Sequence, residues 1–185
     1  MSSKNSKESD NSGKGWLFKI FFITFILSIL FNYLSSEVVT KLNIIVSIIV
    51  LVVFLLIGVS LDLVATAVTA ADEAPFHAKA ADKKRGAKES VKLIKNADKV
   101  SNICADVIGD VCGVLTGATS ALIAVSIANS IGLKDITILT MFMTATVTAL
   151  TVLGKGACKK VAIKNANKII NFIGICISYL KLKKD

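Results

Sequence analysis

Polar residues that interrupt or border long apolar runs are the side chains that could do chemistry in this sequence. Asn102, Asp106 and Asp110 recur every fourth residue, so an amide and two carboxylates would share one face of an α-helix. Asp62 stands alone in a second apolar run. Hard divalent cations such as Mg²⁺ prefer oxygen ligands of this kind, and acidic residues at membrane depth usually mark an ion path or a buried pair. We therefore take Asp62, Asn102 and Asp110 as candidate metal ligands and expect Asp106 to be hydrated at the interface.

A lysine also lies at the end of an apolar run, in the stretch "TVLGKGACKK". Lys155 stands there between Gly154 and Gly156. It could be an ordinary flanking charge whose long side chain reaches the headgroups. It could also stand where a functional group belongs.

The remaining reactive side chains form no recognisable catalytic or zinc-binding motif. The single histidine, His77, has no nucleophile or acid constellation around it, so we interpret it as a surface residue. No pair of cysteines has C-x-x-C spacing, and structural disulfides and zinc sites are both disfavoured; the cysteines are Cys104, Cys112, Cys158 and Cys176. We expect neither an enzyme nor a resident cofactor, with Mg²⁺ considered only as a transported or bound ion.

The elements that must position these residues are long and apolar. The 185 residues are 54% hydrophobic and contain a single proline, and their mean hydropathy is +0.69. A membrane-spanning helix needs about 20 mainly apolar residues, and four stretches approach this length: 20–36, 42–71, 111–133 and 136–154. The first could be a cleaved signal peptide, but no A-x-A cleavage site follows it, so we expect it to be retained. The sequence predicts an all-α, polytopic membrane protein with about four transmembrane helices.

The distribution of positive charge predicts the orientation of these helices. Of the 22 Lys and Arg residues, all but Lys41 and Lys134 lie before residue 20, between 72 and 110, or after 154. Because basic loops remain in the cytoplasm, four spans would place both termini there, at the cell membrane. The net charge of +9 then reflects topology and attraction to the lipid bilayer. Nucleic-acid binding would need a basic soluble face with stacking aromatics, which this sequence lacks.

The polar segments divide the chain further. Residues 1–15 read as a disordered basic tail, residues 16–41 as an additional transmembrane helix with a short outer loop, and residues 42–185 as the main membrane domain. Within it, residues 72–110 predict one or two amphipathic helices against the headgroups, opened by Pro75. The apolar run at 169–180 is too short to span, so we expect it on the surface or beneath the bundle.

Small residues recur along the third predicted span. Gly109, Gly113 and Gly117 are spaced every fourth residue, and Ala121 continues the row. Such a smooth face allows another helix to approach closely. The partner could be a helix of the same bundle or a second copy of the chain.

Several ordered motifs resemble the transmembrane domain of the CorB and cyclin-M (CNNM) magnesium and cobalt transport proteins. In chain order they are "TAV" (66–68), "RGAK" (85–88), "KLIKNADK" (92–99), "GD" (109–110) and "GKGACK" (154–159). The resemblance covers roughly the last two thirds of the chain and implies a divalent cation transporter that forms a homodimer. The sequence is divergent from the family, and no CBS module follows, so we expect no regulation by nucleotides.

The departures from the family pattern concern charge. Lys155 stands at the family's glutamate and Ala65 at its signature glutamate, while Asp62 replaces a serine and Asp110 an asparagine. We therefore hypothesise that the Lys155 ammonium pairs with Asp110 or Asp62 and fills the space where the family would hold a cation. The resemblance favours Mg²⁺ or Co²⁺ transport, whereas the altered charges favour a non-transporting relative that acts as a structural or regulatory partner.

Overall fold

The computed structural model describes residues 18, 20–33, 43–133 and 135–182. Within these residues the chain is helical throughout its regular elements and has no strand, so the predicted all-α class is confirmed there. The predicted disordered tail (1–15) lies outside the described residues. So do residues 34–42, which include the end of the first predicted span and the outer loop.

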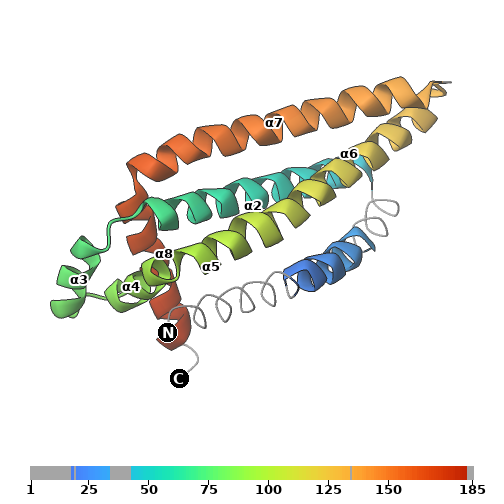
Figure 1. Ribbon diagram of the computed structural model, residues 1–185. Helices are drawn as coiled ribbons and strands as arrows, with labels where there is room; N and C mark the ends of the chain where they lie inside the picture. Colours follow the sequence, from blue (N-terminus) through green and yellow to red (C-terminus); the bar gives the residue numbers. More distant parts are fainter. Residues whose placement is uncertain (1–17, 19, 34–42, 134, 183–185) are drawn as a thin grey trace, which may run out of the picture.

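Three helical stretches are long and apolar enough to cross a membrane. They are α2 (Ile44–Ala70), α7 (Ile136–Lys164) and the continuous stretch Ala97–Ile131. They run side by side, with α2 in contact with both of the others (Figure 1). The described N-terminal helix, Ile20–Tyr33, is apolar but shorter. The structure thus supports three of the four predicted spans by length.

The continuous stretch has three parts. It begins as α5 (Ala97–Ser101), continues as a π-helical segment, η1 (Asn102–Gly109), and becomes α6 (Asp110–Ile131). Gly132 ends α6 with a φ of 71°, a left-handed conformation that glycine adopts without steric cost. At the start of α2, the side chain of Asn43 accepts a hydrogen bond from the backbone N–H of Ile44 at 3.2 Å.

A layer of shorter helices covers the end of the bundle at which α2 stops, here called the Ala70 end (Figure 1). It contains α3 (Ala74–Ala81), α4 (Ala87–Lys95) and α8 (Ala166–Leu182). The connection between α2 and the continuous stretch therefore holds two short helices, α3 and α4, in agreement with the one or two predicted. The C-terminal prediction is confirmed, because α8 packs against α2 and α4 beneath the bundle.

The core of the Ala70 end joins the layer to the long helices. Phe76 from α3 is fully buried against Val68 of α2, Ala162 of α7 and Ile170 of α8. Burying a phenylalanine side chain stabilises a fold by about 1.5–3 kcal/mol. This cluster therefore holds the short helices at a defined position relative to the long ones.

Candidate functional site

The three long helices each carry a charged side chain at a similar depth. Asp62 in α2, Asp110 at the start of α6 and Lys155 in α7 each lie about 20 residues from the opposite end of the bundle, the number that spans the hydrocarbon core. These charges therefore lie at one boundary of the apolar zone, toward the Ala70 end. The helices thus position Asp110 and Lys155 at the same level and Asp62 about one helical turn nearer the Ala70 end, because Gly58 and Val59 of α2 are the residues that meet α6 and α7 there.

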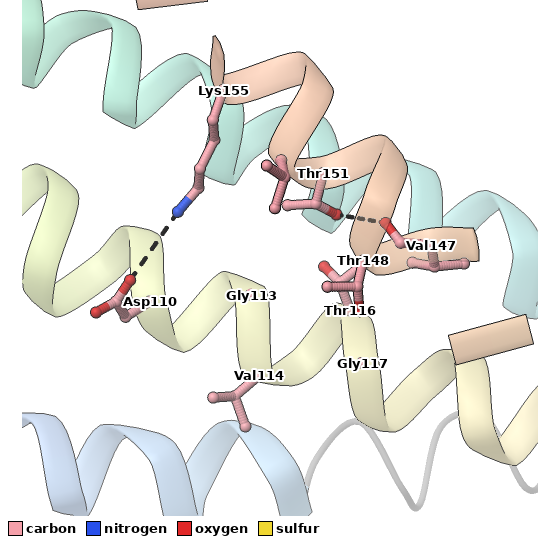
Figure 2. Close-up of a pocket in the computed structure, with 10 residues that line it drawn as sticks. Asp110, Gly113, Val114, Thr116, Gly117, Val147, Thr148, Thr151 and Lys155 are labelled. Carbon is pink, nitrogen blue, oxygen red and sulfur yellow. Dashed lines mark hydrogen bonds and ion pairs between the residues drawn. The ribbon is translucent and has the colours of Figure 1, made fainter. Parts of the chain in front are cut away.

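Lys155 and Asp110 come together across the space between α7 and α6. The Lys155 Nζ lies 3.9 Å from the Asp110 Oδ1, and Figure 2 shows the lysine side chain directed toward the carboxylate. The Lys155 side chain is 26% exposed and that of Asp110 is 70% exposed. Of the two partners hypothesised for Lys155, the structure therefore brings Asp110 to it.

A cleft of about 390 Å³ extends from this ion pair between α6 and α7. Its walls hold small and hydroxyl-bearing residues: Gly113, Thr116 and Gly117 on α6, and Thr148 and Thr151 on α7 (Figure 2). Thr116 donates to the carbonyl of Cys112 at 2.7 Å and Thr151 to that of Val147 at 2.8 Å. These two hydroxyl protons are used within their own helices, so the oxygen lone pairs are what the threonines can offer to the cleft.

Sequence reasoning missed the threonines of α7. A signal was present, because Thr148, Thr151 and Lys155 have the three- and four-residue spacing that places side chains on one helical face. The sequence analysis singled out the glycines of α6, which face these threonines across the cleft.

Asp62 is buried and takes no part in the ion pair between Lys155 and Asp110. The residue is only 7% exposed, and its Oδ2 has no hydrogen-bond partner among the described residues. The hydroxyl of Thr66 bonds to the backbone carbonyl of Asp62 at 2.9 Å and not to the carboxylate. A buried, unpartnered carboxylate oxygen is unfavourable unless a proton or a cation reaches it. Asp62 is therefore the least satisfied polar group of the site.

The segment that follows α5 is a π-helix, not the α-helix that the four-residue spacing of polar residues predicted. Asn102 is its first residue and is partly buried, whereas Asp106 is exposed. Because a π-helical turn is wider than an α-helical turn, residues four apart do not share one face of it as they would in an α-helix. Asn102, Asp106 and Asp110 therefore do not form the single face that was predicted. π-helical turns are rare and frequent at functional sites.

The glycine row has two different environments. A Cβ on Gly109 would lie 3.0 Å from the carbonyl oxygen of Cys104, five residues earlier in its own π-helix. A Cβ on Gly113 or Gly117 would meet no atom of the described chain within 4 Å. Close approach of another helix of the bundle, one of the two readings of this row, is therefore not found at Gly113 and Gly117, which line the cleft. The dimer contact stays a prediction.

Close helix contacts occur at two other glycines. A Cβ on Gly58 of α2 would lie 3.2 Å from the Cβ of Cys112 and 3.7 Å from the carbonyl oxygen of Gly109. A Cβ on Gly154 of α7 would lie 3.2 Å from the Val59 Cγ2. These contacts fix α6 and α7 against α2 next to the charged residues.

The donor set limits how a metal ion could bind. Among the residues that the structure describes, no three His, Cys, Asp or Glu side chains form a metal-binding group. An ion at Asp62 would need amide, carbonyl or water oxygens in addition, which suits Mg²⁺ because it usually retains several waters.

His77 bonds to Glu73 at 2.7 Å on the exposed face of α3, as expected for a surface histidine.

Comparisons with known proteins add no relative. A scan against protein-family models, a search of curated proteins and a search of solved structures each found no match for this chain.

Proposed function

We propose that this chain is an integral membrane protein of the CorB/CNNM type that transports a divalent cation, Mg²⁺ or Co²⁺. Its cation route follows the contact of α2 with the π-helical segment and α6. Asp62 supplies the carboxylate, Asn102 an amide oxygen, and Asp110 a second carboxylate nearer the surface. The protein works in the cell membrane as a homodimer with both termini in the cytoplasm, in keeping with the basic residues at the Ala70 end.

The observation that carries this proposal is the buried Oδ2 of Asp62, which lacks a partner among the described residues. A carboxylate at this depth is costly, and it usually serves an ion path or a paired charge. Lys155 is engaged with Asp110. A cation from outside the chain is then a natural partner for Asp62.

Lys155 has a defined role in this mechanism. Its ammonium neutralises Asp110 while no cation is present, so the site carries less uncompensated negative charge at rest. An entering divalent ion would compete with the ammonium for Asp110, and the flexible lysine stem allows the ammonium to withdraw toward the headgroups. The lysine would thus act as a tethered cation that a transported ion displaces.

One observation favours a second function. The Lys155 ammonium lies 3.9 Å from Asp110 and is only 26% exposed, so it already occupies the space beside one of the proposed ligands. If it never leaves, the chain is a non-transporting relative that acts as a structural or regulatory membrane partner.

Flux of Mg²⁺ and Co²⁺ into proteoliposomes that contain the purified chain distinguishes these functions. We expect flux with the wild type and its loss with Asp62→Asn. Asp106→Asn is the matched control, because it removes the same charge from an exposed residue. Equal loss in both variants would contradict a specific role for Asp62.

The variant Lys155→Glu tests the second function. No flux in the wild type, together with flux gained by Lys155→Glu, would mean that the lysine blocks a cation site. The proposal of transport would then be wrong for the natural chain. Absence of flux in every variant, with folding intact, would equally exclude it.

A further inference from the structure

A basic pocket lies at the Ala70 end, away from the charged residues of the long helices. It has a volume of about 350 Å³ and lies between the α3–α4 turn and α8. Four cationic side chains and one carboxylate contribute to its lining, together with a hydroxyl: Lys83, Lys84, Arg85, Lys88, Glu89 and Ser178. The pocket thus has a net positive charge that nothing in the proposed transport mechanism uses.

The backbone that forms this pocket is rigidly held. Lys83 has a φ of 54°, and Gly86 has a φ of 76°, so the chain turns sharply between α3 and α4. Gly86 lies directly against α8, where a Cβ would come within 2.5 Å of the backbone nitrogen of Ile175. The buried hydroxyl of Ser90 bonds to the carbonyls of Gly86 and Ile170 at 3.0 and 3.1 Å. The lysines are therefore presented from a fixed turn.

Arg85 is held by an aromatic residue of α8. Its Nη1 lies 3.4 Å from the hydroxyl oxygen of Tyr179, and its guanidinium carbon is 5.6 Å from the centre of that ring. The guanidinium is planar and retains further donors for a ligand. The Lys84 Nζ lies 3.9 Å from the Asp82 Oδ2, and both side chains are largely exposed. An exposed ion pair of this kind is weak, so Lys84 can leave Asp82 for a ligand.

The position of the pocket indicates where its ligand comes from. The helices α4 and α8 pack together, and α8 also packs on α2, the most apolar of the three long helices (Figure 1). The pocket therefore lies in the basic layer at the Ala70 end, beyond the charged residues of the long helices. In a membrane, the phosphate groups of lipids lie outside the apolar zone, and clusters of four or more basic residues beside a span are typical of anionic-lipid binding.

We propose that this pocket binds the phosphate group of an anionic membrane lipid. Lys83, Lys84 and Lys88 supply point charges, and Arg85 supplies directed N–H donors from its place against Tyr179. Glu89 limits the net charge and can accept a hydrogen bond from a lipid headgroup hydroxyl. Because the pocket involves both α4 and α8, a bound lipid would hold these two helices together.

Thermal unfolding of the full chain in detergent micelles tests this proposal. The probes are dioctanoyl phosphatidylglycerol, dioctanoyl phosphatidylcholine and inorganic phosphate. We expect saturating phosphatidylglycerol to raise the melting temperature by about 5 °C and phosphatidylcholine to leave it unchanged. The triple variant Lys83→Gln, Lys84→Gln, Lys88→Gln should lose at least half of this rise.

A matched control separates the pocket from general charge effects. Lys159→Gln, Lys160→Gln and Lys164→Gln remove the same charge from exposed lysines at the end of α7, and this variant should keep the full rise. An equal loss in both triple variants would overturn the proposal. A rise caused by inorganic phosphate to the same extent would overturn the assignment to lipid and leave free phosphate as the ligand.

Discussion

The hydroxyl of Ser90 in α4 lies 3.1 Å from the carbonyl oxygen of Ile170 in α8, eighty positions further along the chain. Both residues are fully buried. A buried hydroxyl needs such a partner, because leaving it without one costs about 1–3 kcal/mol. The contact shows that the C-terminal helix, whose apolar run is too short to span a bilayer, is a structural part of the folded unit.

We predict that Gly174→Ala destabilises the protein. A Cβ at this position would overlap the Ser90 hydroxyl and lie 2.5 Å from the carbonyl oxygen of Gly86. Overpacking of this kind costs about 1–3 kcal/mol or more, and chemical unfolding in detergent would measure the loss. Gly156→Ala in α7 is the matched control, since its Cβ would meet no atom within 4 Å, and it should be neutral or stabilising. Equal stability of the two variants would contradict the close crossing of α4 and α8.

The π-helical segment leads to a second prediction. Gly109→Ala would place a Cβ 3.0 Å from the carbonyl oxygen of Cys104, so we expect the free energy of unfolding to fall by about 1 kcal/mol or more. Gly113→Ala and Gly117→Ala meet no atom within 4 Å and should raise it by up to about 1 kcal/mol through helix propensity. The same unfolding assay compares all three. A loss of stability at Gly113 or Gly117 would instead indicate a helix packed there, as in a dimer.

The ion pair between Lys155 and Asp110 should show measurable but modest coupling. We predict a coupling energy of about 0.5–1 kcal/mol in a double-mutant cycle of Asp110→Asn and Lys155→Met, because Asp110 is largely exposed and such pairs are partly screened. The cycle is measured from unfolding of the two single variants and the double variant. Strictly additive effects would mean that the ammonium prefers the headgroups to the carboxylate.

Asp62 leads to a prediction on stability without metal. Replacing its buried carboxylate with an amide in Asp62→Asn should increase the free energy of unfolding, because the charged group lacks a partner for its Oδ2 among the described residues. The expected gain is about 1–3 kcal/mol. Asp106→Asn, at an exposed position, should change it little. A loss of stability in Asp62→Asn would show that the carboxylate is already paired.

The same residue should make stability depend on Mg²⁺. If the ion binds at Asp62, Mg²⁺ at one hundred times its dissociation constant stabilises the wild type by about 2.7 kcal/mol. Asp62→Asn should lose this effect, whereas Asp106→Asn should retain it. An identical response of the wild type and both variants would exclude Asp62 as a ligand.

Much of the architecture follows from the sequence, because the apolar runs are long and the charges are confined to their ends. The ranges predicted for the second, third and fourth spans agree with α2, α6 and the first part of α7, which continues to Lys164. The α3–α4 boundary was harder to predict. It depends on Gly86 meeting Ile175 of α8, a contact between segments far apart in the chain.

The site was only partly predictable. The candidate residues could be named from their types, but periodicity does not give the rotation of one helix against another. The choice between Asp110 and Asp62 as the partner of Lys155 therefore needed the structure. The π-helix was also missed, because its i→i+5 bonds leave no mark in an apolar pattern that is otherwise helical.

The common depth of Asp110 and Lys155 has a consequence for the membranes that would suit the proposed topology. These two residues limit the uninterrupted apolar height of α6 and α7 to about 30 Å, whereas α2 continues beyond Asp62 with eight uncharged residues, 63–70. In a thicker bilayer α6 and α7 could not adapt by reducing their tilt without drawing these charges into hydrocarbon. The surrounding lipid would have to thin instead, at a cost of fractions of a kcal/mol per ångström. In the proposed membrane arrangement, α6 and α7 would therefore favour bilayers of ordinary or smaller thickness over thicker ones.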